Sequence, residues 1–352
     1  MATYLIRGGK KLHGTADVRT AKNSAVAAMC AALLTDQPVT LVAAPRIAEV
    51  DSMARVLSSI GVHLRWHGRN LVLRTPRRLK LNRIDATAAV RTRSVLLLLG
   101  ALLHRTVRFA IPRSGGCQLG RRTVLPHLYA LERFGVKITT RHYAYHVQRG
   151  RRLRGADVTM YESGDTPTEN VLLAAALADG TTTVSLASAN YQVQDLCYLL
   201  TAMGAKIEGI GTTTLVIEGV PKLHGTRYHL IPDPTEAMFW LSLSATTKSP
   251  LTITGCPEEF LRLELLKLEK MGFACRVLRR YPSRSGHFTL VDLRTQPGRL
   301  RALEDKIYGR PFPGLNIDNL PFFVPVATQA RGATLIHDWV YAHRALYYLE
   351  FS

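Results

Sequence analysis

Polar and apolar residues follow one another along the chain in a block that recurs five times. Each block opens with polar residues, continues as an apolar or alanine-rich stretch of helical length, and ends in a turn and a β-branched strand. The apolar stretches are residues 25–34, 94–103, 171–178, 237–245 and 318–328. Helices this apolar cannot face water, so we expect them to be buried, with their polar N-termini pointing outwards. Free N–H groups and the helix dipole favour anions at such ends.

A second helix closes each complete block with an apolar residue followed by glycine. The closing glycines are Gly61, Gly135, Gly204 and Gly272, separated by 74, 69 and 68 positions. Glycine just past a helix end is typical of a C-cap, and a spacing this regular indicates an internal repeat. In the fifth block the closing helix, expected over residues 341–351, stops before such a glycine. We therefore expect a native chain that continues past Ser352.

Length and composition limit the number of domains and the kind of protein that this chain can be. A chain of 352 residues is long enough for two domains. The longest apolar run, residues 95–103, is too short to span a bilayer, and the first residues do not resemble a signal peptide. The five cysteines are scattered and none forms a C-x-x-C pair, which indicates a reducing compartment without a disulfide framework or a cysteine zinc site. We expect a cytoplasmic protein with no membrane segment.

The formal net charge of +20 suits an anionic partner, either a nucleic acid or a phosphorylated substrate. The basic residues are dispersed, and no nucleic-acid-binding motif accompanies them, so a nucleic-acid partner is the weaker hypothesis.

The segment from Ile111 to Arg122 contains the chain's most distinctive chemistry. Three glycines surround Cys117, and Arg121 and Arg122 close the segment. Glycine lets the backbone approach a ligand closely, nearby guanidinium groups favour a thiolate, and arginine is well shaped for carboxylate and phosphate. The alternative is a surface loop with an incidental buried cysteine.

Several short motifs together resemble the UDP-N-acetylglucosamine 1-carboxyvinyltransferase family. These are A-K-N at 21–23, V-D at 50–51, G-G-C-x-x-G-x-R at 115–122, T-E-N at 168–170, P-D-x-x-E at 232–236, F-P…D at 312–318, and Arg344. The resemblance covers nearly all of the chain except about residues 281–315.

The resemblance implies a mixed α/β fold, the two-domain enolpyruvyl-transferase fold or inverse α/β barrel. Repeated βαβαββ-like units bury their helices and place their sheets outside, around a central cleft, and the last unit is missing here. The family's chain crosses between domains twice, which implies one domain of residues 1–20 with 232–352 and a second of residues 21–231.

The activity implied is transfer of an enolpyruvyl group from phosphoenolpyruvate to the 3′-hydroxyl of UDP-N-acetylglucosamine, with release of phosphate, in peptidoglycan precursor synthesis. No cofactor and no metal is implied, and the histidines show no ligand spacing. The partners are the two substrates, and the oligomeric state is open.

The resemblance also implies roles for individual residues. Cys117 is the expected proton donor and fosfomycin target, since a thiol can switch protonation state near neutral pH. Asp318 is the candidate base, or alternatively an N-cap. Several cationic and polar residues are expected to hold the anionic substrates. The alternative for each cation is an ordinary surface charge. The residues expected to bind phosphoenolpyruvate are Lys22, Asn23, Arg122 and Arg344, and Lys22 is also expected to be catalytic. The residues expected to bind the UDP-sugar are Asn23, Arg93, Arg122, Asp318 and Val340. Asp51 and Glu236 are either site residues or ordinary salt-bridge partners.

The chain departs from the family pattern around the nucleotide. Residues 163–170 replace the family's S-V-G-A-T-E-N, Leu125 replaces an aspartate, and residues 190–192 replace Glu-Pro-Glu. Two alternatives to the transferase therefore remain, a non-catalytic homologue that binds a sugar nucleotide and a basic nucleic-acid-binding protein. Steep salt dependence of nucleic-acid binding would favour the latter.

Overall fold

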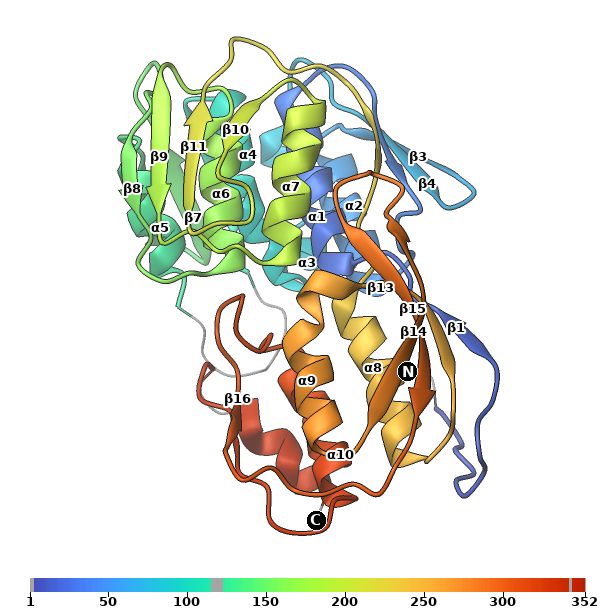
Figure 1. Ribbon diagram of the computed structural model, residues 1–352. Helices are drawn as coiled ribbons and strands as arrows, with labels where there is room; N and C mark the ends of the chain where they lie inside the picture. The colour runs from blue at the N-terminus through green and yellow to red at the C-terminus, as the bar shows by residue number, and fades with distance from the viewer. Residues whose placement is uncertain (1–2, 115–122, 342–343, 352) are drawn as a thin grey trace. The chain divides into compact units, whose positions relative to one another are not determined.

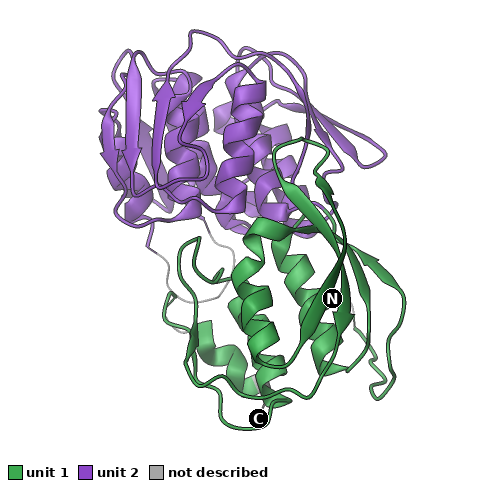
Figure 2. Cartoon of the chain, viewed as in Figure 1, with its two compact units in different colours: residues 1–19, 232–352 green, residues 20–231 purple. Residues whose placement is uncertain are grey.

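The computed structural model describes residues 3–114, 123–341 and 344–351, and the chain divides into two compact units. Unit 1 comprises residues 1–19 and 232–352, and unit 2 comprises residues 20–231 (Figure 2). Unit 1 is thus built from both ends of the chain, whereas unit 2 is one continuous segment. The boundary at 231/232 is the one that the family resemblance implies, and the first boundary differs from it by one residue.

Unit 2 contains three sheets, each formed mainly by one sequence repeat (Figure 1). The first sheet has the strand order β12 (Arg227–His229), β2 (Val39–Val42), β4 (Asn70–Arg74) and β3 (His63–His67). The second has the order β5 (Arg108–Pro112), β7 (Ala144–Gln148) and β6 (Lys137–Arg141). The third has the order β8 (Asp157–Thr159), β9 (Thr181–Ser185), β11 (Thr214–Glu218) and β10 (Lys206–Glu208). Both four-stranded sheets have one parallel pair followed by an antiparallel hairpin.

The helices of unit 2 lie mostly in its interior, apart from the 3-10 helix Leu81–Arg83, none of whose residues is buried. They are α1 (Lys22–Ala31), η1 (Ala32–Leu34), α2 (Ala48–Ser59), η2 (Leu81–Arg83), α3 (Ala86–Val90), η3 (Arg93–Leu97), α4 (Leu98–Ala101), η4 (Leu102–His104), α5 (Leu125–Glu132), α6 (Asp165–Ala175) and α7 (Tyr191–Ala202), where η denotes a 3-10 helix. Every residue from Ser24 to Ala31 in α1 and from Pro167 to Ala175 in α6 is buried. Figure 1 shows α1, α6 and α7 inside the unit, with β8, β9 and β11 outside them. The prediction of buried apolar helices is therefore correct for this unit.

The third repeat of unit 2 shows the whole pattern, running β8, α6, β9, α7, β10 and β11 in chain order. The first repeat obtains its parallel edge strand from far along the chain, since β2 pairs with β12. Unit 1 does the same, since β13 pairs with the N-terminal strand β1. A βαβαββ unit accounts for both sheets once these exchanged edge strands are included.

Unit 1 is built on a sheet of β1 (Thr15–Asp17), β13 (Thr252–Pro257), β15 (Thr289–Gln296) and β14 (Ala274–Pro282). Its further elements are α8 (Pro234–Thr246), η5 (Glu258–Phe260), α9 (Arg262–Lys270), β16 (Ile307–Tyr308), η6 (Leu320–Phe322), α10 (Phe323–Thr328), β17 (Ile336–His337) and η7 (Arg344–Phe351). Side chains from α8, α9, α10 and the sheet form the unit's own apolar core.

The glycines that close the repeats adopt the left-handed conformation that the spacing predicted. Their φ angles are +100° at Gly61, +73° at Gly135, +102° at Gly204 and +92° at Gly272. After α2, the Gly61 N–H donates to the Ser58 carbonyl and the Val62 N–H to the Leu57 carbonyl. This pair of bonds is a Schellman motif, which satisfies carbonyls at the helix end and requires positive φ at the glycine.

The second repeat departs from its expected helix over residues 94–103, which is divided into η3, α4 and η4. The Asn170 amide of α6 is inserted between two groups that an α-helix would pair. Its Nδ2 donates to the Leu96 carbonyl (3.0 Å), and its Oδ1 accepts from the Gly100 N–H (2.7 Å). An inserted side chain interrupts the i→i−4 ladder, which explains the break.

The fifth repeat is also less regular than expected. Its first helix divides into η6 and α10, its strand is only the two residues of β17, and its closing segment is the 3-10 helix η7. In η7, Arg344 and Tyr347 both bond Asp338 Oδ2, at 2.7 and 3.3 Å. A 3-10 helix aligns side chains three residues apart, so this shared carboxylate favours it over an α-helix. None of the described helices is long and apolar enough to cross a membrane.

Candidate active site

Lys22 and Asn23 are the first two residues of α1, whose N-cap residue is Ala21. The Ala21 N–H donates to the Ile231 carbonyl, which fixes the start of the helix against the last residue of unit 2. The Lys22 side chain is 35% exposed, so it is partly open to solvent. A cation placed at a helix N-terminus forms, with the free N–H groups, an anion-binding surface.

A carboxylate that the motifs did not identify holds Lys22 in place. Glu49, in the first turn of α2, lies 2.7 Å from the Lys22 Nζ through its Oε2. Its other oxygen, Oε1, accepts the hydroxyls of Thr92 (2.9 Å) and Ser94 (2.7 Å). Burial alone would raise the pKa of the Glu49 carboxyl. Lys22 and the two hydroxyls outweigh burial, so the pKa lies below its ordinary value.

Arg93 lies between those two hydroxyl residues, at the start of η3. It is half-buried, and its guanidinium donates to the Thr123 carbonyl (2.8 Å). Lys22 and Arg93, which the family resemblance assigns to substrate binding, are therefore connected in unit 2 through Glu49 and its hydroxyl partners. Cys117 and Arg122, predicted for the same site, lie outside the described residues.

Asn23 is held by Tyr191, one of the residues in which the chain departs from the family pattern. Its Nδ2 donates to the hydroxyl of this buried tyrosine at 3.1 Å. With Nδ2 engaged in this bond, Asn23 can offer its Oδ1 as an acceptor to a ligand.

The two altered segments of unit 2 contact each other. Asp165 accepts from the Ser188 hydroxyl (2.5 Å) and the Asn190 amide (2.9 Å), and Glu169 accepts from the Gln192 amide (3.0 Å). Burial, followed by the nearby Asp165, raises the pKa of Glu169 to about 8. The two segments that depart from the family pattern, 163–170 and 190–192, are therefore joined by hydrogen bonds.

In unit 1, Asp318 is exposed, and its backbone N–H donates to Asn316 Oδ1 (2.9 Å). The following helix, η6, has Asn319 at its N-cap, so the alternative role of Asp318 as that cap is not observed. Asp318 is close enough to Asp233 that, after burial and Glu236, its charge helps to raise the Asp233 pKa.

The P-D-x-x-E motif has a structural function in unit 1. Asp233 is the N-cap of α8 and accepts the Thr235 N–H (2.8 Å). Glu236 accepts the Arg19 N–H (2.8 Å), and the Asp233 N–H donates to the Arg19 carbonyl (2.7 Å). Together these bonds attach the N-terminal segment to α8. Asp51, the other uncertain acid of the motifs, is exposed on α2.

Arg344 is buried, with only 3% of its surface exposed. Its Nε lies 2.7 Å from Asp338 Oδ2, and its guanidinium lies 5.2 Å from the Tyr341 ring centroid. In this conformation Arg344 is an internal ion-pair partner rather than an accessible anion ligand. Val340, the remaining predicted residue, is half-buried in the segment after β17.

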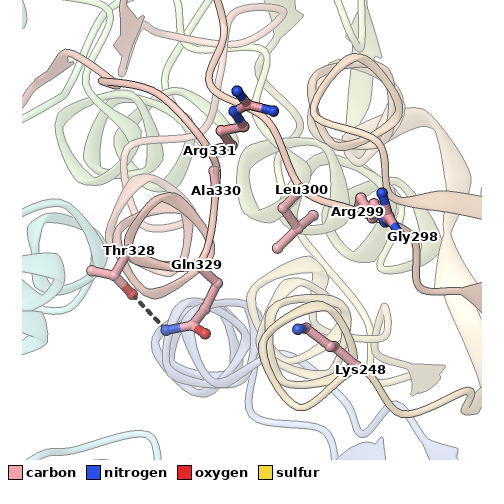
Figure 3. Close-up of a pocket in the computed structure, with 8 residues that line it drawn as sticks. All are labelled: Lys248, Gly298, Arg299, Leu300, Thr328, Gln329, Ala330 and Arg331. Carbon is pink, nitrogen blue, oxygen red and sulfur yellow. Dashed lines mark hydrogen bonds between the residues drawn. The ribbon is translucent and has the colours of Figure 1, made fainter.

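A pocket of about 450 Å³ in unit 1 contains none of the predicted residues (Figure 3). Lys248, Arg299 and Arg331 line it, and Thr328 and Gln329 form a hydrogen bond at one side. The pocket lies just past the C-terminal ends of α8 and α10, where cations complement the helix dipoles. The three cationic side chains are exposed, and we assign them the role of complementing these helix dipoles. Among the described residues, no group of three His, Cys, Asp or Glu side chains could hold a metal ion.

Comparison with known proteins identifies the family. The family model for EPSP synthase (3-phosphoshikimate 1-carboxyvinyltransferase) matches residues 6–345. The chain belongs to this family. It is 35% identical to a UDP-N-acetylglucosamine 1-carboxyvinyltransferase of Bradyrhizobium diazoefficiens, over 98% of this chain and 78% of the relative. It is 33% identical to UDP-N-acetylglucosamine 1-carboxyvinyltransferase 2 of Caldanaerobacter subterraneus, over 99% of this chain and 80% of the relative.

Solved structures of the family share the fold. The enolpyruvyl transferase NikO from Streptomyces tendae has a TM-score of 0.80 at 24% identity, over 98% of this chain and 79% of that one. An EPSP synthase from Acinetobacter baumannii has a TM-score of 0.74 at 18% identity, over 97% and 78% of the two chains. The predicted family, its two-domain fold and its class, an enolpyruvyl transferase, are therefore confirmed.

Sequence reasoning missed Glu49, Thr92, Ser94 and Tyr191. Glu49 immediately precedes the V-D motif, and Thr92 and Ser94 flank Arg93. An acid in a first helical turn and hydroxyls beside a site arginine were the available signals. Which of these residues meet in space depends on contacts between residues 27 (49 − 22) to 168 positions apart in the chain.

Proposed function

We propose that the protein transfers the enolpyruvyl group of phosphoenolpyruvate to the 3′-hydroxyl of UDP-N-acetylglucosamine and releases phosphate. This is the first committed step of peptidoglycan precursor synthesis, in the cytoplasm. The observation that carries the proposal is the common name of relatives that match nearly the whole chain at 33–35% identity. The cation cluster of Lys22 and Arg93 at the α1 and η3 N-termini supports it, because both substrates are anionic.

The chemistry requires an acid, a base and fixed positive charge. The 3′-oxygen forms a bond to C2 of phosphoenolpyruvate, while the methylene C3 takes a proton and the hydroxyl loses one. The resulting tetrahedral intermediate then loses phosphate, and C3 returns a proton, which restores the double bond. Cations that already hold the phosphate and carboxylate stabilise this intermediate most strongly when they need no rearrangement.

We assign the roles to individual residues. Cys117 donates the proton to C3 and is the fosfomycin target, and Asp318, exposed in unit 1, accepts the hydroxyl proton. Lys22, Arg93 and Arg122 bind the anionic groups, and Asn23 hydrogen-bonds the substrate or intermediate. Arg344 contacts phosphoenolpyruvate only if its pair with Asp338 opens, and Val340 lines the sugar-nucleotide side. The two compact units are the two domains of the enzyme.

Phosphate release from the two substrates together, compared with either alone, is the direct test. The wild type should release phosphate only with both present, and Cys117→Ser and Asp318→Asn should each lower kcat strongly while the fold is retained. Turnover that persists unchanged in Cys117→Ser would falsify the proton-donor assignment. Sugar-nucleotide binding without phosphate release would instead favour a non-catalytic homologue, and steeply salt-dependent nucleic-acid binding the third hypothesis.

A further inference from the structure

Glu49 contacts one predicted site residue, Lys22, and both chain neighbours of another, Arg93. One carboxylate accepts from Lys22, Thr92 and Ser94 at 2.7, 2.9 and 2.7 Å. These partners come from two different repeats of unit 2, one at the start of α1 and the others at the start of η3. Asp51, two residues further along α2, is exposed, and residues so spaced do not share a helix face.

Each oxygen of Glu49 has a distinct task. Through Oε2 it engages one of the three ammonium donors of Lys22, so the others remain available to a ligand. Through Oε1 it accepts both hydroxyls that flank Arg93. Thr92 and Ser94 are themselves buried, and the Thr92 oxygen also accepts the Ser94 N–H at 3.1 Å, which caps η3. The backbone that carries Arg93 is therefore fixed from the same carboxylate as Lys22.

The charges favour this arrangement. Glu49 places a negative charge beside the Lys22 ammonium at the N-terminal turn of α2, where the helix dipole stabilises an anion. Through these contacts Glu49 connects the segment that carries Lys22 with the segment that carries Arg93.

We propose that Glu49 is a positioning residue, whose carboxylate sets the Lys22 ammonium and the Thr92–Ser94 turn in the geometry needed to bind the anionic substrates. The kinetic part of this proposal rests on the proposed function, whereas the structural part concerns Lys22 alone. Misplacing a binding group by about 1 Å can cost about 10²-fold in rate, so Glu49 should matter for turnover without touching a substrate.

Chemical labelling tests the structural part without any substrate. In Glu49→Gln, Lys22 loses its carboxylate partner, so its acylation by acetic anhydride should rise about two- to fivefold, measured by peptide mass spectrometry. Glu218→Gln is the matched control, because Glu218 lies 2.6 Å from Lys206 on the exposed hairpin of β10 and β11. It should raise labelling of Lys206 and leave Lys22 unchanged. Unchanged Lys22 labelling in Glu49→Gln overturns the proposal.

Kinetics test the positioning role. Glu49→Gln should lower kcat/KM about 10- to 100-fold with an unchanged Tm, and Glu218→Gln should leave both unchanged. In a Lys22→Ala background, Glu49→Gln should have a much smaller further effect, because the two residues act as one unit. Effects that multiply in the double variant, or a loss of activity that simply follows a loss of Tm, contradict the proposal.

A second variant keeps the test decisive if Glu49→Gln fails to fold. Thr92→Val removes one hydroxyl but keeps every charge, so it should lower kcat/KM while Lys22 labelling stays at the wild-type level. Wild-type kcat/KM in folded Thr92→Val would show that the turn at Arg93 needs no anchoring by Glu49. A wild type that releases no phosphate would overturn the proposed function, while the labelling result would still decide the role of Glu49.

Discussion

Arg344 shows how the surroundings of one residue determine what its motif can do. The resemblance assigns it to phosphoenolpyruvate, but its guanidinium is buried against a carboxylate whose side chain has no exposed surface. Opening such a pair costs more than opening a surface pair, because each ion would be left in an apolar environment without its partner. Arg344 is therefore, first of all, a structural residue of unit 1.

Arg344→Ala should destabilise the protein by about 3–5 kcal/mol, since it leaves the buried Asp338 carboxylate without its cation. Urea denaturation monitored by circular dichroism would measure the loss. Arg279→Ala is the matched control, because Arg279 pairs with Asp292 at 3.0 Å in the same unit but its side chain is 66% exposed. Its effect should be much smaller. Equal losses of unfolding free energy in the two variants would show that burial does not make the Arg344 pair more important for stability than an exposed pair.

At the scale of elements, local chemistry was predictable from the sequence and long-range contacts were not. The glycines that end α2, α5, α7 and α9 were identified correctly, because a C-cap depends only on the few residues around it. The division of residues 93–104 into three short helices was not, because it depends on Asn170, about 70 residues away in the chain. Glu49 was missed for the same reason. The T-E-N motif marked Asn170 without revealing that it is a structural bridge.

Asn170→Ala should cost about 2–5 kcal/mol of unfolding free energy, because it leaves the Leu96 carbonyl and the Gly100 N–H buried without their partner. The Asn170 Nδ2 also lies 2.8 Å from His127 Nδ1, so that nitrogen loses a contact too. Gly100→Ala should also destabilise this junction, since a Cβ there would lie 2.3 Å from the Asn170 backbone carbonyl oxygen and 2.9 Å from its Oδ1. Thermal unfolding of both variants can be compared with that of Ala86→Gly in α3, a mild helix reference. Losses no larger than this reference would mean that the bridge contributes little.

At the scale of the whole molecule, the buried ionisable groups make stability depend on pH. Burial raises the pKa of Asp195 to about 7 and that of Glu169 to about 8. Burial lowers the pKa of His104 to about 4 and that of His127 to about 3. The acids bind more protons when folded, so they reduce stability as pH rises, whereas the histidines reduce it as pH falls below about 6.5. The two effects oppose each other in mildly acidic solution.

Between pH 6.5 and 8 the histidines no longer contribute, and Asp195 contributes only up to about pH 7, so Glu169 causes most of the change in stability. Its folded pKa of about 8 exceeds its ordinary value of 4.5, so stability is fully present below pH 4.5 and falls until the pH passes 8. About 1.5 pH units of this range lie above pH 6.5, which corresponds to a loss of about 2 kcal/mol. Glu169→Gln, which can still accept from Gln192 and cannot ionise, should flatten this part of the profile, as urea denaturation at several pH values would show. A slope between pH 6.5 and 8 that is as steep in Glu169→Gln as in the wild type would mean that other groups cause it, and that Glu169 ionises in the folded protein as readily as in the unfolded chain.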